Sequence, residues 1–108
     1  MASNEFEKGE KFSFNNSISY NDKAVVSKHV LKKENGNISL FAFDKGEGLS
    51  EHTTPFDAVV YIVDGKADII INGISNVLEA NETIVMPANI PHALKAIERF
   101  KMVLTMIK

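Results

Sequence analysis

Short runs of apolar and β-branched residues alternate with turn residues along most of the chain. In the last run, residues 100–107, every second side chain falls on one face, which is the period of two that β-strands show. Further runs rich in such residues cover 24–33, 38–44, 58–63, 67–71, 83–86 and 92–97. No window of about a dozen residues shows the repeat of an amphipathic helix. The pattern predicts an all-β domain.

Three dipeptides punctuate these runs. Asn35-Gly36, Asp64-Gly65 and Asn72-Gly73 each stand between apolar segments. Such pairs favour the type I′ turn of a β-hairpin, because both central residues tolerate positive φ. Short strands at intervals of about 8 to 12 residues are typical of antiparallel sandwiches and barrels. We therefore expect three hairpins within a barrel or sandwich.

Two of the runs are apolar on both faces. Residues 59–63 and 69–71 contain almost no polar side chain, so both sides of these strands are expected to contact protein. A barrel interior accounts for one side, and another segment or a second copy of the chain accounts for the other. The pattern favours a homodimer. Residues 1–22 are expected to form a tail or a strand exchanged between subunits, and residues 23–108 the barrel domain.

Composition narrows the class of protein. With 108 residues the chain matches one domain, and with no cysteine it has neither a disulfide framework nor a thiolate metal site. The lack of cysteine, of a signal peptide and of a long apolar run predicts a cytoplasmic protein that does not contact membranes. A formal net charge of −2, with both signs interspersed, argues against nucleic acid as a partner.

Two segments carry a recognisable pattern. Residues 51–65, EHTTPFDAVVYIVDG, place one histidine before a proline and an apolar run, and residues 84–96, IVMPANIPHALKA, place a second histidine after two prolines. Segments 46–65 and 81–96 resemble the two motifs of the cupin superfamily, and the chain looks most like its small single-domain conserved-barrel (cupin 2 type) proteins. The resemblance implies an RmlC-like jelly-roll barrel, or double-stranded β-helix, and no settled reaction.

The resemblance also implies a site. In metal-binding cupins the first motif supplies two histidines and a glutamate, and the second motif supplies one more histidine. His52 and His92 match the first and last ligands, whereas Thr54 and Ala58 stand where a histidine and a glutamate belong. Because a catalytic metal usually takes three protein ligands, two imidazoles would hold iron, manganese, nickel or zinc only weakly. We expect both histidines to lie on strands that face one another and to meet across the cavity at the barrel mouth, with no firmly bound cofactor.

Other side chains are weaker candidates for the site. Tyr61, Met86 and Met102 are candidates for a ligand-binding wall, although such residues in strands more often fill a core. Strand parity permits His29 to face inward, but its charged neighbourhood favours a position near solvent. Asp57 is expected to cap the loop that enters its strand.

Three functions remain open from the sequence. The leading hypothesis is a small organic ligand bound in the barrel, with His52 and His92 at its mouth. The first alternative is a metal-dependent cupin enzyme of the dioxygenase or isomerase type, which needs a third ligand that the sequence does not identify. The second is a structural or regulatory assembly module in which both histidines only fill polar positions.

Overall fold

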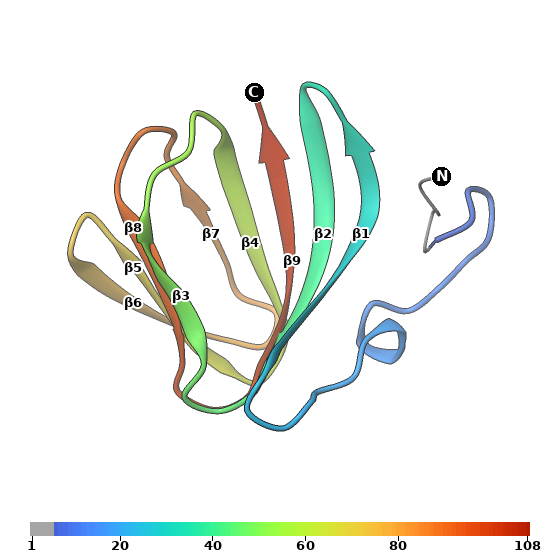
Figure 1. Cartoon of the computed structure of the whole chain (residues 1–108), viewed down its shortest axis with the longest axis horizontal. Helices are drawn as coiled ribbons and strands as arrows, with labels where there is room; N and C mark the ends of the chain where they lie inside the picture. Colours follow the sequence, from blue (N-terminus) through green and yellow to red (C-terminus); the bar gives the residue numbers. More distant parts are fainter. Residues whose placement is uncertain (1–5) are drawn as a thin grey trace.

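The computed structural model describes residues 6–108, and their regular secondary structure is almost entirely β-strand (Figure 1). The elements in chain order are η1 (Asn15–Ser17), β1 (Val25–Lys33), β2 (Gly36–Phe43), β3 (Gly48–His52), β4 (Asp57–Asp64), β5 (Lys66–Ile71), β6 (Ile74–Glu79), β7 (Thr83–Met86), β8 (His92–Ala96) and β9 (Phe100–Ile107). Only η1, a single 3₁₀ turn, is helical within the described part of the chain. The all-β prediction is confirmed.

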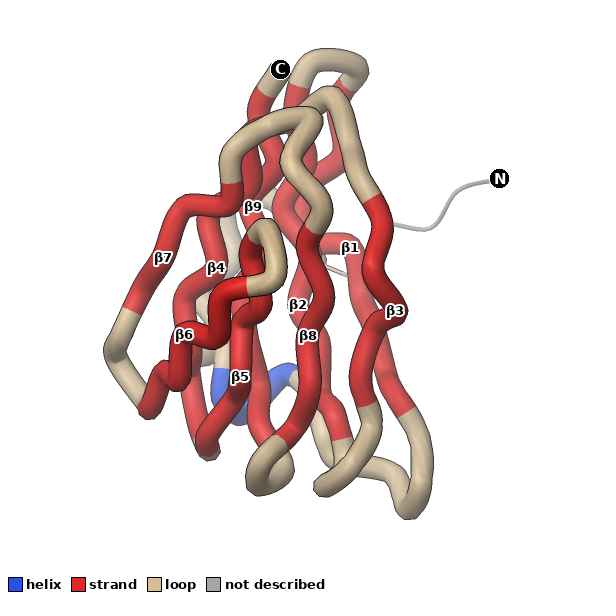
Figure 2. The backbone as a smooth tube through the Cα atoms, turned by 90° about the vertical axis from the view of Figure 1, so that its left-hand side faces the viewer, coloured by secondary structure: helices blue, strands red, loops and turns tan. Residues whose placement is uncertain are grey.

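The strands form two antiparallel sheets that face each other. The larger sheet has the order β1-β2-β9-β4-β7, and the smaller sheet has the order β3-β8-β5-β6. Figure 2 shows the smaller sheet in front, with the strands of the larger sheet behind it. Consecutive strands often lie in different sheets, as in a jelly-roll barrel, so the chain crosses repeatedly from one layer to the other.

The core lies between the inner faces of the two sheets. Alternate residues of β4 turn inward, so Ala58, Val60 and Ile62 are at most 1 % exposed. At the deep end of the core the rings of Phe43 and Phe100 stack with their centroids 4.5 Å apart. Each fully buried side chain of this size contributes about 1.5–3 kcal/mol to folding. The interior of the barrel is therefore packed with side chains rather than open.

The predicted turns have mixed outcomes. The Asn72-Gly73 hairpin is confirmed, with φ of 51° and 79° between the paired residues of β5 and β6. A hairpin also joins β1 to β2, but Gly36 already pairs with Lys33, so residues 34 and 35 form its turn. The Asp64-Gly65 prediction is wrong, because β4 and β5 lie in different sheets. Gly65, at φ 87°, instead marks a corner between the layers.

Two strands were not anticipated from the sequence. β3 and β6 form the two edges of the smaller sheet, where most of their residues are exposed. An edge strand needs few apolar side chains, because one of its sides has no neighbouring strand and much of its surface meets water. The apolar pattern that identifies buried strands is consequently weak in both.

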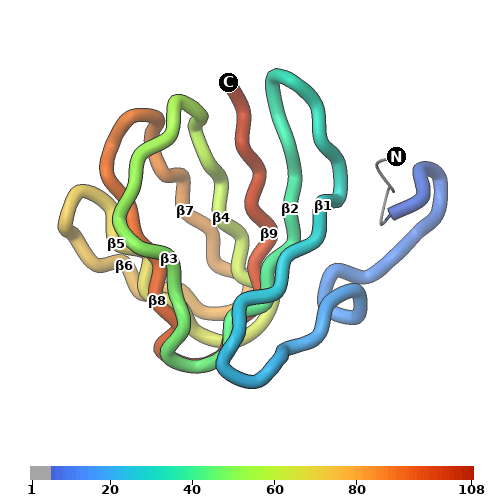
Figure 3. Tube along the Cα trace, in the orientation of Figure 1, coloured from blue at the N-terminus to red at the C-terminus, as the bar shows by residue number. Residues whose placement is uncertain are grey.

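The N-terminal segment lies against the outer face of the larger sheet (Figure 3). Ile18 is only 3 % exposed there. Two lysines of the sheet fasten the segment, since the Lys101 ammonium donates to the Asn15 carbonyl at 2.6 Å and the Lys28 ammonium donates to the Ser17 carbonyl at 2.8 Å. Residues 6–22 form no strand. They cover this part of the outer face of the sheet within the same chain. The domain boundary at residue 23 and exchange between subunits stay predictions.

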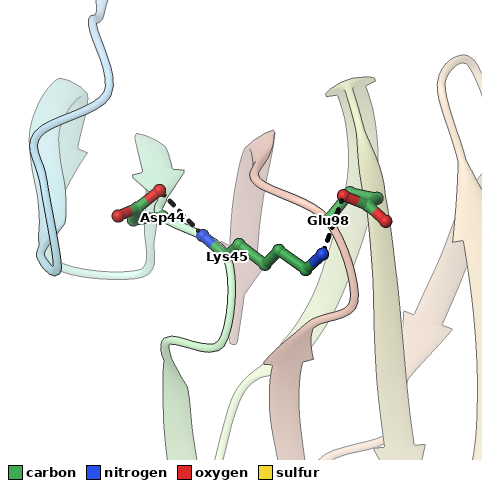
Figure 4. A network of polar contacts seen from close by, with 3 residues as sticks. All are labelled: Asp44, Lys45 and Glu98. Carbon is green, nitrogen blue, oxygen red and sulfur yellow. Dashed lines mark hydrogen bonds and ion pairs between the residues drawn. The ribbon is translucent and has the colours of Figure 1, made fainter.

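Polar contacts join the loops at one end of the barrel (Figure 4). Backbone N–H groups of Lys23 and Lys45 donate to the Asp44 carboxylate and lower its pKa. The Lys45 ammonium lies 3.7 Å from the Glu98 carboxylate, and both side chains are well exposed, so this pair adds little stability. These residues precede β3 and follow β8. The opposite ends of the same two strands carry His52 and His92.

Candidate functional site

His52 ends β3 and His92 begins β8, and the two residues are direct partners in the antiparallel ladder. His92 is 3 % exposed and shares the inner face of β8 with Leu94, whereas His52 is exposed. Leu49 and His52 are three residues apart, so a regular strand would turn them to opposite faces. A register shift between them places both beside inward-facing residues of β8. The local bulge is what brings the histidines together.

The two loops that carry the histidines are tied to each other. The Asn89 N–H donates to the Thr54 carbonyl at 2.7 Å, and the Ala88 N–H donates to the Asp57 carboxylate at 2.9 Å. Asp57 therefore has the loop-capping contact expected from the sequence. Asn89 adopts φ 64°, a left-handed conformation that asparagine tolerates better than most residues. These contacts hold the β3–β4 and β7–β8 connections in fixed relation at the barrel mouth.

Backbone carbonyls orient both imidazole rings. The Nδ1 atom of His52 lies 2.7 Å from the Ser50 carbonyl oxygen, and that of His92 lies 3.2 Å from the Ile90 carbonyl oxygen. Because a carbonyl only accepts hydrogen bonds, each Nδ1 carries the proton in the neutral ring, which leaves each Nε2 with a lone pair. The two Nε2 atoms are 3.2 Å apart. This contact is favourable when a proton or a cation lies between them.

The two rings differ in burial. Burial lowers the pKa of His92; its contact with the Ile90 carbonyl opposes this effect, and the nearby charge of His52 reinforces it. His52 is exposed, whereas His92 is buried. A single proton between the two Nε2 atoms would give the pair one positive charge at the edge of the barrel mouth.

We expect acid to destabilise the fold through His92. Its folded pKa lies below the ordinary 6.5, so the unfolded chain binds a proton first as the pH falls. The stabilising contribution is complete above 6.5 and is lost as the pH falls towards the lowered pKa. Thermal unfolding measured from pH 7.5 to 5 should show a smaller decline for His92→Gln than for the unchanged chain. Equal declines would contradict this assignment.

The donor set meets only part of what a metal requires. Two nitrogens that share one metal at about 2.0–2.1 Å lie roughly 2.9–3.4 Å apart, and the observed separation of the Nε2 atoms is 3.2 Å. The spacing fits. Within residues 6–108, however, no group of three or more His, Cys, Asp or Glu side chains is placed to hold a metal. Ala58 is buried, and the Thr54 hydroxyl accepts a hydrogen bond from the Phe56 N–H at 3.3 Å. The set is too small for a firmly held catalytic metal.

The other candidate ligand-binding residues lie at different places in the barrel. Met86 pairs with Ala58 in the first inward-facing row of the larger sheet, while Met102 pairs with Ile62 deeper in the core. Tyr61 packs on the outer face, among the cluster under the N-terminal segment, and its hydroxyl donates to the Asn81 side chain at 2.8 Å. Tyr61 is therefore remote from the barrel interior.

His29 lies outside the pair as well. It is exposed on the edge strand β1, and its Nδ1 atom is 3.1 Å from the Ser39 hydroxyl. The expectation of a position near solvent is confirmed. One geometric expectation needs correction, since His52 and His92 do not face each other across the barrel from opposite walls but are neighbours in the same sheet. The carbonyl that orients each imidazole ring belongs to the residue two positions earlier in the chain. A contact to the backbone leaves no side-chain pattern in the sequence, so it could not be predicted.

Comparison with known proteins identifies the family. The model for the cupin domain matches residues 39–108, which include both histidines and both tied loops. The chain belongs to the cupin family. A conserved protein of unknown function from Streptococcus pyogenes has 33 % sequence identity and a TM-score of 0.92, with 97 % of this chain and 92 % of that chain covered.

Two further cupin structures are similar. A cupin 2 conserved barrel domain protein from Leptotrichia buccalis has 36 % identity and a TM-score of 0.87, and the match covers 90 % of this chain but only 47 % of that protein. A cupin superfamily protein from Desulfitobacterium hafniense has 25 % identity and a TM-score of 0.88, with 95 % and 94 % covered. No curated protein matched the chain. Among the described residues of this cupin, none of the helical structure is long and apolar enough to cross a membrane.

Proposed function

We propose that this cupin binds a small organic molecule with an acidic head group at the His52–His92 pair. The observation that carries the proposal is the convergence of the two Nε2 atoms at 3.2 Å, with both Nδ1 atoms bound to backbone carbonyls. Such a pair becomes positively charged on taking up one proton. A carboxylate that accepts a hydrogen bond from the protonated Nε2 atom would satisfy that charge in place of the contact between rings.

The barrel mouth is the expected position of the ligand. The interior is filled by core side chains, and Met86 and Met102 are 2 % and 0 % exposed. His52 is the member of the pair that solvent reaches, so the ligand would approach from its side. Binding of an organic ligand, in a cytoplasmic setting as the lack of cysteine suggests, requires no metal and no third protein ligand. This proposal therefore agrees with the depleted donor set.

A thermal shift panel of small carboxylic acids, each with its uncharged amide analogue, tests the function. We expect at least one acid to raise the melting temperature and its amide to have little effect. At ten times the dissociation constant, binding stabilises the fold by about 1.4 kcal/mol, which corresponds to several degrees for a domain of this size. His52→Ala should abolish the shift, whereas His29→Ala, the control at an exposed histidine outside the pair, should retain it. Shifts that survive His52→Ala would refute the proposal.

A metal-dependent enzyme is the second candidate, and the separation of the Nε2 atoms favours it. In that case His52 and His92 would hold iron, manganese, nickel or zinc, which would polarise a substrate oxygen or activate water. Elemental analysis of the purified protein should then find close to one metal ion per chain, and less in His92→Ala. Metal well below one equivalent, after growth with each of these ions, would contradict the metal-dependent enzyme.

A further inference from the structure

One row of side chains borders the barrel mouth on the smaller sheet. His52 of β3 pairs with His92 of β8. His92 pairs in turn with Ile71 of β5, and Ile71 pairs with Ile74 of β6. Ile74 is four residues from the buried Leu78 on the same strand, and this even offset turns both side chains towards the barrel interior. The row is therefore polar at the β3 edge and apolar at the β6 edge.

The larger sheet supplies a second row that faces the first. Its members, on β2, β9, β4 and β7, are Asn37, Met106, Ala58 and Met86. Short connections join β2 to β3, β8 to β9, β4 to β5 and β6 to β7 at the end of the barrel away from the histidines. Each of these strands is thus opposite the strand it is joined to, which places Met106 across from His92 and Met86 across from Ile74. Beyond the histidine pair the mouth is apolar on both sheets.

The apolar part of the mouth is uncovered at Ile74. This side chain is 66 % exposed, the highest value among the large apolar side chains of the described residues. Ile71 is partly buried, and Met86, opposite Ile74, is only 2 % exposed. A single exposed isoleucine is ordinary on a protein surface. Here, however, it continues a row that begins at the histidine pair, so the floor of the mouth is closed while its rim is open.

The hairpin that carries Ile74 is fixed relative to the histidines. The Asn72 N–H donates to the Pro91 carbonyl at 2.8 Å, and His92 directly follows Pro91. Ile74 begins the strand that leaves the same hairpin. Because β5 is the one strand between β8 and β6, and neighbouring strands lie about 4.8 Å apart, Ile74 is roughly 10 Å from His92 along the row. The polar and apolar ends of the mouth thus have a set separation.

We propose that the acid held by the histidine pair carries an unbranched aliphatic tail, which lies along this row and ends against Ile74. The assignment rests on the proposed function, because the carboxylate at the His52–His92 pair fixes one end of the ligand. A polar tail would find no good hydrogen-bonding side chain at Ile71, Met86 or Ile74. An extended chain advances about 1.2 Å per bond, so a span of about 10 Å takes roughly eight bonds. The ligand class is a medium-chain monocarboxylate, with octanoate as its probe.

Calorimetric titration of the full chain with butanoate, hexanoate and octanoate tests the tail. Each methylene that is fully buried tightens binding about fourfold, and one at an open rim, which stays half hydrated, about twofold. Octanoate should therefore bind at least about tenfold more tightly than butanoate. Methyl octanoate has the same tail without the charge and should bind far more weakly than octanoate, which separates the free acid from an esterified chain.

Substitutions on β6 test where the tail ends. Ile74→Ser should weaken octanoate about fivefold and leave butanoate unchanged, because only the longer acid reaches the rim. Ile74→Val keeps an apolar, β-branched side chain and should retain most of the octanoate affinity. Val77→Ser is the matched control, since Val77 is 51 % exposed on the same strand but, three residues from Ile74, points to the outer face. It should bind both acids like the unchanged chain, and circular dichroism checks that each variant folds.

The outcomes separate the tail from the head group. Acids that require His52 for binding but show no gain with chain length would refute the tail and leave the proposed function standing. Equal weakening of octanoate by Ile74→Ser and Val77→Ser would also overturn the assignment, because the tail would then not follow the mouth row. Octanoate that binds His52→Ala as well as the unchanged chain, or no binding by any acid, would refute both the tail and the acid-binding function.

Discussion

Replacing Gly65 by alanine is expected to destabilise the fold by more than about 3 kcal/mol, or to prevent folding altogether. A Cβ atom at this position would overlap the Arg99 carbonyl oxygen and lie 2.7 Å from the Cα atom of Phe100. Both obstacles belong to the backbone, and Phe100 is fully buried in the core, so neither can move away cheaply. The residue also holds φ 87°, where a side chain adds strain of its own.

Gly46→Ala separates the two causes. Gly46 has nearly the same φ, 85°, but nothing lies within 4 Å of a Cβ atom built on it. Its substitution should cost only the conformational strain, about 1–2 kcal/mol. Urea unfolding measures the free energy of unfolding of both variants. If their m-values are equal, the difference between the two losses is the part caused by the close approach of the new methyl group to the backbone. Similar losses for the two variants would show that the backbone near Arg99 and Phe100 yields to the added methyl group.

Gly65 also shows where reading the sequence reaches its limit. The Asp64-Gly65 dipeptide was interpreted as a hairpin turn, because local rules describe which φ a residue can adopt and not which strand comes next to it. The constraint on Gly65 comes from residues 99 and 100, far along the chain. Asn72-Gly73 obeys the same local rule and does form the hairpin, since β5 and β6 are true neighbours. Seven of the nine strands and the turn at Asn72-Gly73 were predictable from local pattern, whereas the jelly-roll arrangement of the strands was expected only from the family resemblance.

The site shows a similar division. His52 and His92 were identified from the motif pattern, and their convergence is observed. The bulge after Leu49 that turns His52 inward has no sequence signature that we can name. Tyr61 is different, because strand parity alone could have excluded it. It is three residues from the inward-facing Ala58, and an odd offset in a regular strand points to the other face.

The double variant Thr54→His with Ala58→Glu is expected to tighten zinc binding by at least two orders of magnitude. The histidine pair already has the separation that two ligands of one metal need, and its rings are fixed by the Ser50 and Ile90 carbonyls. Each substitution adds a donor of the type that the cupin motif has at that position, and a preorganised pair loses little freedom on binding. Calorimetric titration with zinc measures the change.

Stability provides the internal check on this variant. Ala58 is 1 % exposed, so a glutamate there is buried near the core and should destabilise the metal-free protein. Zinc should reverse that loss, because binding to the folded state alone stabilises it. The same two substitutions in a His92→Ala background remove the buried member of the pair, so affinity and rescue should both fall sharply. If zinc affinity is instead unchanged by restoring positions 54 and 58, their side chains do not point at the His52–His92 pair, and the missing ligands cannot explain why this cupin would hold metal weakly.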